Sequence, residues 1–160
     1  LAAIDYQGPV YIRLGRAETK DIHDDSYHFE WGKAEVLRQG SDVSIFATGI
    51  MTAKALDAAE TLAQQGIQAE VINVHTIKPL DEETVIASAK KTGKVVTAEE
   101  HSIIGGLGSA VAEVLARQCP TKQAFVGVQD SFGESGSPDD LLEKYGLTAE
   151  VIVKAAVGLQ

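Results

Sequence analysis

From residue 42 onward, segments of strand character alternate with segments of helical periodicity, and this alternation constrains the fold more than any other feature. Between the short apolar runs, apolar residues recur at helical spacing, as in Ala55, Leu56, Ala59 and Leu62. Such an order is typical of a parallel sheet covered by helices on both faces. We therefore predict an α/β fold, a three-layer open sheet that is mostly parallel, with strands at 42–47, 69–74, 94–98 and 123–128 and helices at 52–65, 82–91, 105–117, 138–145 and 148–157.

Two further strands are expected before this alternation begins. Residues 33–38 and 42–47 flank Gln39-Gly40-Ser41, and two short strands joined by a glycine turn predict an antiparallel hairpin. Residues 33–38 would then form an antiparallel edge strand of the sheet. Near the start of the chain, Val10, Ile12 and Leu14 alternate with Tyr11 and Arg13, which also predicts a strand.

Length and charge exclude several classes of protein. The chain has 160 residues and a formal net charge of -9, which argues against a partner such as nucleic acid or an anionic membrane surface. No apolar run approaches the ~20 residues of a membrane span. The only cysteine, Cys119, rules out an internal disulfide and a cysteine-based zinc site, and it is consistent with a cytoplasmic protein.

Polar residues follow the predicted strands at the edge of the sheet where ligands bind in this fold class. Glu99-Glu100-His101 precedes the turn Gly105-Gly-Leu-Gly-Ser109. Glu99 with His101 is either a general acid–base pair or a contact between subunits, and we favour the contact. The turn either binds an anion through backbone N–H groups or allows close packing, and we favour packing because the spacing matches no nucleotide motif. His75 lies in a loop that leads to Asp81, a predicted helix cap.

Residues 15–30 are rich in Asp, His and Lys and poor in aliphatic side chains. His23 and His28 with the neighbouring aspartates suggest a metal site, but their spacing matches no defined ligand motif. We therefore interpret the stretch as a solvated connector.

Four motifs together resemble the C-terminal part of transketolases. They are Gly8-Pro-Val-Tyr-Ile-Arg-Leu-Gly-Arg16, Val71-Ile-Asn-Val-His-Thr-Ile-Lys-Pro-Leu-Asp81, Thr97-Ala-Glu-Glu-His101 with Gly105-Gly-Leu-Gly-Ser109, and Asp130-Ser-Phe-Gly-Glu-Ser-Gly136. Several of them recur in 1-deoxyxylulose-5-phosphate synthase and in the beta subunits of 2-oxo acid dehydrogenases. The motif around Phe132 favours transketolase itself, in the short form whose two halves are separate chains.

The resemblance implies three regions. Residues 1–16 would be the C-terminal remnant of a pyrimidine-binding domain, residues 17–31 a linker, and residues 32–160 the transketolase C-terminal domain. The start at Leu1, without Met, fits a chain severed from its catalytic half. Thiamine diphosphate and Mg²⁺ would belong to the full enzyme and would not bind this chain alone. We therefore expect no catalytic residue here.

The implied activity is the transfer of two-carbon ketol units between sugar phosphates. Arg16 matches the position in the motif whose arginine binds the sugar phosphate in the family, and the resemblance therefore implies this role for Arg16. Arg13 is the alternative candidate for that role. Expected partners are the N-terminal transketolase half and a second copy in a homodimer. His75, Glu99, Glu100 and His101 would lie at an interface or active-site edge. A stand-alone anion-binding α/β module of flavodoxin-like architecture and a pure assembly domain remain as alternatives.

Overall fold

A computed structural model of the chain describes residues 2–15 and 18–160. Its order of elements begins with a short helix and then alternates as predicted. The elements are α1 (Ala2–Asp5), β1 (Glu35–Arg38), β2 (Val43–Ala47), α2 (Met51–Gln64), β3 (Ala69–Asn73), α3 (Glu82–Thr92), β4 (Lys94–Ser102), α4 (Leu107–Gln118), β5 (Lys122–Val128), α5 (Pro138–Lys144) and α6 (Ala149–Val157).

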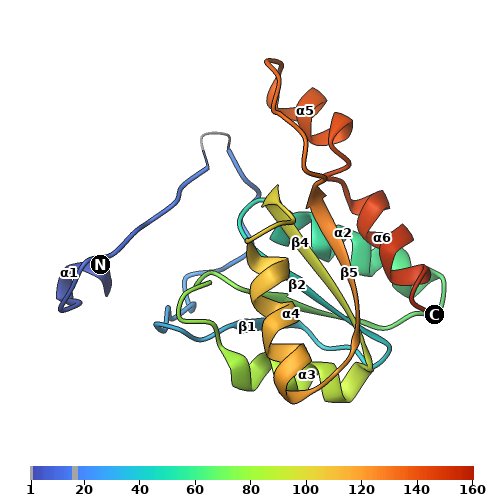
Figure 1. Cartoon of the computed structure of the whole chain (residues 1–160), viewed down its shortest axis with the longest axis horizontal. Helices are drawn as coiled ribbons and strands as arrows, with labels where there is room; N and C mark the ends of the chain where they lie inside the picture. The colour runs from blue at the N-terminus through green and yellow to red at the C-terminus, as the bar shows by residue number, and fades with distance from the viewer. Residues whose placement is uncertain (1, 16–17) are drawn as a thin grey trace.

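The sheet has five strands in the order β1-β3-β2-β4-β5 (Figure 1). Strands β2, β3, β4 and β5 run parallel, and β1 runs antiparallel to β3 at the edge. The predicted fold class, a mostly parallel sheet with one antiparallel edge strand, is therefore confirmed. Since β3 and β4 lie on opposite sides of β2, the carboxyl end of β2 is the topological switch point.

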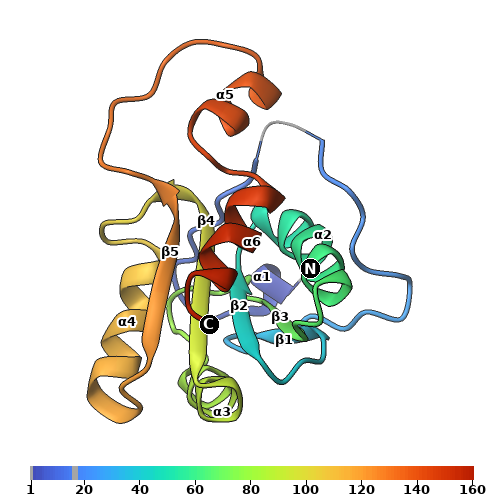
Figure 2. The same cartoon turned by 90° about the vertical axis from the view of Figure 1, so that its right-hand side faces the viewer.

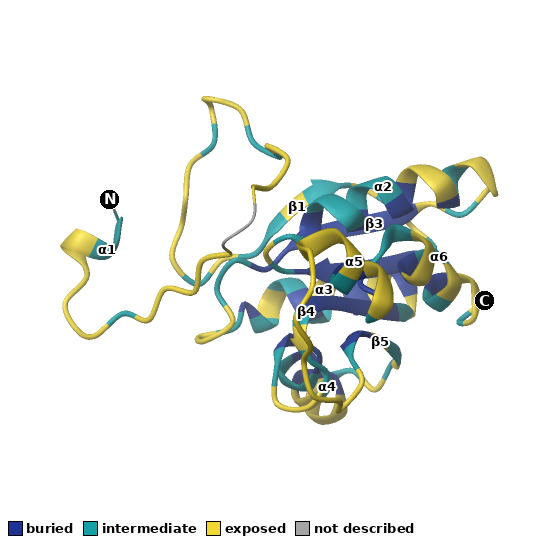
Figure 3. Ribbon diagram, turned by 90° about the horizontal axis from the view of Figure 1, so that it is seen from above, coloured by how far each residue is buried: buried dark blue, intermediate teal, exposed yellow. Residues whose placement is uncertain are grey.

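Helices cover both faces of the sheet, as Figure 2 shows. One apolar cluster joins α2 and α6 to the sheet through residues such as Ile45, Leu62 and Ile152. The other joins α3 and α4 to it through residues such as Phe46, Val85 and Leu107. All five residues of β2 are buried, because a central strand with helices on both faces has no solvent side. The neighbouring strand β3 is also fully buried, as its dark blue colour in Figure 3 shows.

The predicted hairpin of residues 33–38 and 42–47 is wrong. Strand β1 pairs with β3, and both edges of β2 are taken by β3 and β4. The connection turns against β3 instead, where the backbone N–H groups of Ser41 and Asp42 donate to the Gln68 carbonyl. Gly40 permits this close approach, because a Cβ there would lie 2.2 Å from the Ala69 carbonyl carbon.

Residues 10–14 do not form the predicted strand. Ile12 is 60% exposed and Leu14 is 83% exposed, so most of the alternating apolar surface is not packed. A single extended segment without a neighbouring strand has no partner for its ladder of hydrogen bonds. In Figure 1 this segment and α1 stand away from the body of the domain.

Three helices begin close to where the sequence predicts, each at a capping side chain. The Asp81 carboxylate accepts a hydrogen bond from the Thr84 N–H, and the Ser137 and Thr148 hydroxyls cap α5 and α6 in the same way. Burial alone would raise the pKa of Asp81, but hydrogen bonds from Ala34 and Thr84 outweigh it and lower that pKa. Asp81 thus fixes both the start of α3 and the segment that enters β1.

Candidate functional site

The candidate site is the carboxyl-terminal edge of the sheet, where the loops after β2, β3, β4 and β5 meet. Glu99, Glu100 and His101 lie in the last part of β4, and His75 follows β3. The Ile103 N–H donates to the Val128 carbonyl at 3.1 Å, which ties the loop after β4 to the end of β5. The fold therefore gathers the predicted residues on one edge, as parallel strands require.

Glu99 is a buried helix cap. Its side chain is 2% exposed, and its two oxygens accept from the Leu107 and Gly108 N–H groups at 2.7 and 2.8 Å. These donors belong to the first turn of α4, where the positive end of the helix dipole favours a carboxylate. A Cβ on Gly106 would lie 2.0 Å from one Glu99 oxygen, so glycine is what allows the carboxylate to approach.

This contact decides how the Gly105–Ser109 turn is used. The backbone donors of Leu107 and Gly108, which would bind an external anion, already bind Glu99. The Gly105 N–H is also used, because it donates to the Ser109 hydroxyl at 2.8 Å. The turn therefore serves the packing role that we favoured from sequence.

His101 stands at the exposed side of Glu99. Its Nδ1 lies 2.9 Å from the Ser102 carbonyl and 4.0 Å from the nearer Glu99 oxygen. Because a carbonyl only accepts, Nδ1 carries the proton in this contact. The separation of 4.0 Å exceeds a hydrogen bond, so Glu99 and His101 are not arranged as a proton-transfer pair.

Glu100 is contacted by the N-terminal segment. The Arg13 guanidinium donates to the Glu100 carbonyl at 3.1 Å and lies 3.9 Å from its carboxylate. Both side chains remain about half exposed. Arg13 thus brings residues 10–14 to the carboxyl edge, close to the switch point. Arg16, the predicted phosphate ligand, lies outside the described residues.

His75 is separated from Glu99 and lies in a different environment. Its Nδ1 is 2.8 Å from the Thr76 hydroxyl, and its ring packs on Phe29 with centroids 4.5 Å apart. Burial lowers the pKa of His75, His23 lowers it further, and Glu35 opposes both. Phe29 also packs edge-on against Trp31, which contacts Tyr6 beyond α1.

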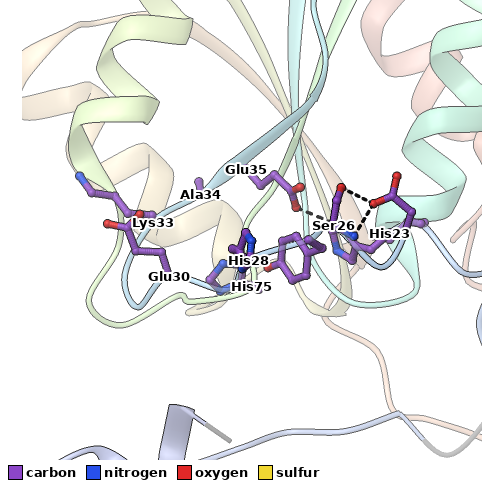
Figure 4. Close-up of a pocket in the computed structure, with 11 residues that line it drawn as sticks. His23, Ser26, His28, Glu30, Lys33, Ala34, Glu35 and His75 are labelled. Carbon is purple, nitrogen blue, oxygen red and sulfur yellow. Dashed lines mark hydrogen bonds and ion pairs between the residues drawn. The ribbon is translucent and has the colours of Figure 1, made fainter.

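A polar pocket of about 460 Å³ opens between His75, the start of β1 and residues 22–30 (Figure 4). In it the His23 ring stacks on Tyr27 at 3.8 Å, and His23 Nδ1 lies 3.5 Å from Glu35 Oε2. That buried oxygen accepts no hydrogen bond from the described residues. The stretch predicted as a solvated connector is therefore partly packed on the domain.

The geometry does not support the hypothesis of a metal site at His23 and His28. Within residues 2–15 and 18–160, no three His, Cys, Asp or Glu side chains are grouped to hold a metal ion. The sequence reasoning missed the pocket because Glu35 and His75 are far from His23 in sequence. The alternating pattern that places Glu35 in a strand does not reveal which segment covers it.

No helix in the described ranges is long and apolar enough for a membrane crossing.

Comparisons with known proteins agree with this architecture. Residues 32–152 match the family model "Transketolase, C-terminal domain". A "6-deoxy-6-sulfo-D-fructose transketolase subunit SqwH" from Clostridium sp. (strain MSTE9) is 60% identical over 151 residues, which are 94% of this chain and 47% of that protein. A "1-deoxy-D-xylulose-5-phosphate synthase" from Desulforudis audaxviator is 40% identical, with 96% of this chain covering 25% of that protein.

A solved structure described as "Split gene transketolase, inactive beta4 tetramer" superposes with a TM-score of 0.95 at 53% identity. The match covers 99% of this chain and 52% of that one. The chain thus spans about half the length of the transketolase subunits that it resembles. By its family match and its fold, the chain belongs to the transketolase C-terminal domain family.

Proposed function

We propose that this chain is the C-terminal part of a thiamine-diphosphate-dependent transketolase that moves two-carbon ketol units between sugar phosphates. Its role is to assemble the enzyme and to support an active site in the other half. The observation that carries the proposal is the family match over residues 32–152, in a chain that covers about half of relatives named as transketolase subunits. The proposed partners are that half and a second copy of this chain, in the cytoplasm.

The described residues do not fit a site for Mg²⁺ and a diphosphate. No group of three His, Cys, Asp or Glu side chains in the described ranges is placed to bind a metal ion. The buried carboxylate at the carboxyl edge, Glu99, is already bound to backbone N–H groups. We therefore place thiamine diphosphate and Mg²⁺ in the other half of the enzyme and assign no chemical step on them to this chain.

Residues 1–16 are proposed to complete the pyrimidine-binding domain, with 17–31 as linker and 32–160 as the C-terminal domain. The exposure of Ile12 and Leu14 supports this division, because alternating apolar side chains are typical of a strand that packs in a sheet. Arg16 is proposed to bind the sugar phosphate, since a planar guanidinium matches two oxygens of a phosphate.

The proposal is tested on the assembled enzyme, prepared with its thiamine-binding half, and on this chain alone. Ketol transfer between sugar phosphates is expected only from the assembly, and calorimetry is expected to detect no thiamine diphosphate binding by this chain. Arg16→Ala should raise the KM for the phosphorylated donor about tenfold or more, while Arg38→Ala should leave it unchanged. Micromolar binding of the cofactor by this chain alone would overturn the division of labour.

The relative named as a 1-deoxy-D-xylulose-5-phosphate synthase favours a second candidate within the same family. The two are separated by product, since an assembly that forms 1-deoxyxylulose 5-phosphate and transfers no ketol unit would be that synthase. A nucleotide thermal-shift screen addresses the anion-binding alternative. Because Glu99 occupies the N–H groups of α4, no nucleotide is expected to raise the melting temperature.

A further inference from the structure

The loop of residues 129–137, between β5 and α5, presents a bare phenyl ring. Phe132 is 97% exposed, the largest exposed fraction among the large apolar side chains of the described chain. The loop and α5 project beyond the carboxyl edge of the sheet (Figures 1 and 2). An exposed aromatic ring contributes strongly to binding when a partner's pocket buries it.

The backbone that carries this ring is held in place. The Tyr145 hydroxyl donates to the Phe132 carbonyl at 3.0 Å, and Lys144 pairs with Glu134 at 2.6 Å. Asp130 adopts a φ of 45°, in the left-handed region that Asp and Asn enter more readily than other residues with a side chain. Because these contacts restrict the loop backbone, less entropy is lost when a partner receives Phe132.

The surroundings of Phe132 are acidic. Asp130, Glu134, Asp139, Asp140 and Glu143 lie on the loop or on α5, and Lys144 is the single basic residue between 129 and 145. That lysine is already paired with Glu134. The surface that complements this loop is therefore an apolar pocket with basic residues around its rim.

The N-terminal segment points to the occupant. Arg13 contacts Glu100 at the same edge, and the Ile103–Val128 hydrogen bond places the loop after β4 beside the end of β5. If residues 10–14 complete the pyrimidine-binding domain, as proposed above, that domain lies next to this edge of the sheet. A contact between loop 129–137 and the same loop of a second copy is disfavoured, because two acidic loops would face each other.

We propose that Phe132 is the anchor by which loop 129–137 docks onto the thiamine-binding half of the enzyme, in an apolar pocket with a basic rim. This inference rests on the proposed function, because it takes its partner from it. It adds a specific contact, the phenyl ring, and a specific chemistry for the surface that receives it.

The test measures the affinity of this chain for the thiamine-binding half by calorimetry, and ketol transfer in the same samples. Phe132→Ala should weaken the affinity about 30-fold. The control, Val157→Ala, changes a partly exposed residue of α6 and should leave the affinity unchanged. Asp139→Asn should slow association several-fold at low salt. Circular dichroism melts should match wild type, because Phe132 makes little contact with the fold.

The outcomes separate this proposal from the proposed function. Equal affinities for wild type and Phe132→Ala would overturn the docking contact, even in an assembly with full ketol transfer. A loss of affinity in Phe132→Ala would support it, even if the assembly transferred no ketol unit and the proposed function failed. Light scattering gives a third outcome. Self-association of this chain that Phe132→Ala abolishes would assign the contact to a second copy and overturn the proposal.

Discussion

The two ends of the sheet each bury a glutamate and satisfy it differently. At the amino end, Glu70 of β3 is 3% exposed and is bound by the Lys91 ammonium and the Ser88 hydroxyl. Ser88 and Thr92 also bond to Ser44 at 2.6 and 2.7 Å. At the carboxyl end, Glu99 has no side-chain hydrogen-bond partner among the described residues and depends on backbone N–H groups of α4.

The difference shows which buried glutamate has partners that can adjust to a substitution. Side chains that can rotate surround Glu70, so that network can adjust when one member changes. Glu99 is held by fixed donors, and the edge around it carries outward-facing apolar side chains such as Ile104 and Phe132. The amino end therefore has the character of a closed structural network, and the carboxyl end that of an open surface with exposed apolar side chains.

A matched pair of substitutions tests this contrast. Glu99→Gln should lower the free energy of unfolding by about 3 kcal/mol, because the amide NH₂ group would face a backbone N–H and the charge at the helix terminus is lost. Glu70→Gln should cost about 1 kcal/mol, because Lys91 can turn toward water and the Ser88 hydroxyl can reorient. Urea unfolding monitored by circular dichroism measures both. Equal losses would refute the distinction between the two ends.

Gly106→Ala should lower the free energy of unfolding by about 2 kcal/mol, because a Cβ placed 2.0 Å from a carboxylate oxygen must displace it from two hydrogen bonds. The matched control is Gly133→Ala, where a Cβ meets nothing within 4 Å. The control should melt within a degree or two of wild type. If Gly106→Ala melts there as well, the Glu99 cap tolerates displacement.

Acidification should affect the carboxyl end through His75. Its pKa is lowered in the folded state by burial, so the unfolded chain takes up a proton first as the pH falls below the ordinary value of 6.5. The stability that uncharged His75 contributes to the folded state is therefore fully present above pH 6.5 and is lost as the pH falls through the lowered pKa. His75→Phe should flatten this part of the profile in urea unfolding at pH 5 to 8. An unchanged slope would mean that other groups dominate.

Much of the architecture follows from local pattern, and the site does not. The alternation after residue 42 and capping residues such as Asp81 predict the elements, because these signals act within a few residues. The short glycine turn predicts that β1 pairs with β2, but β1 pairs with β3. The close contact of Gly40 with Ala69 cannot be predicted from the turn sequence. For Glu99 the sequence leaves two alternatives, an acid–base pair with His101 or a contact between subunits, and it does not predict the helix cap. Its donors come from the next helix, and only the packed structure brings them within reach.

Trp31, the only tryptophan of the chain, connects Phe29 on the domain side with Tyr6 near α1. Its indole N–H also donates to the Ala2 carbonyl at 3.4 Å. The protein thus carries a native fluorophore at the junction between the N-terminal segment and the domain. Without any added label, the emission of Trp31 would report on any change in how the N-terminal segment packs against the domain.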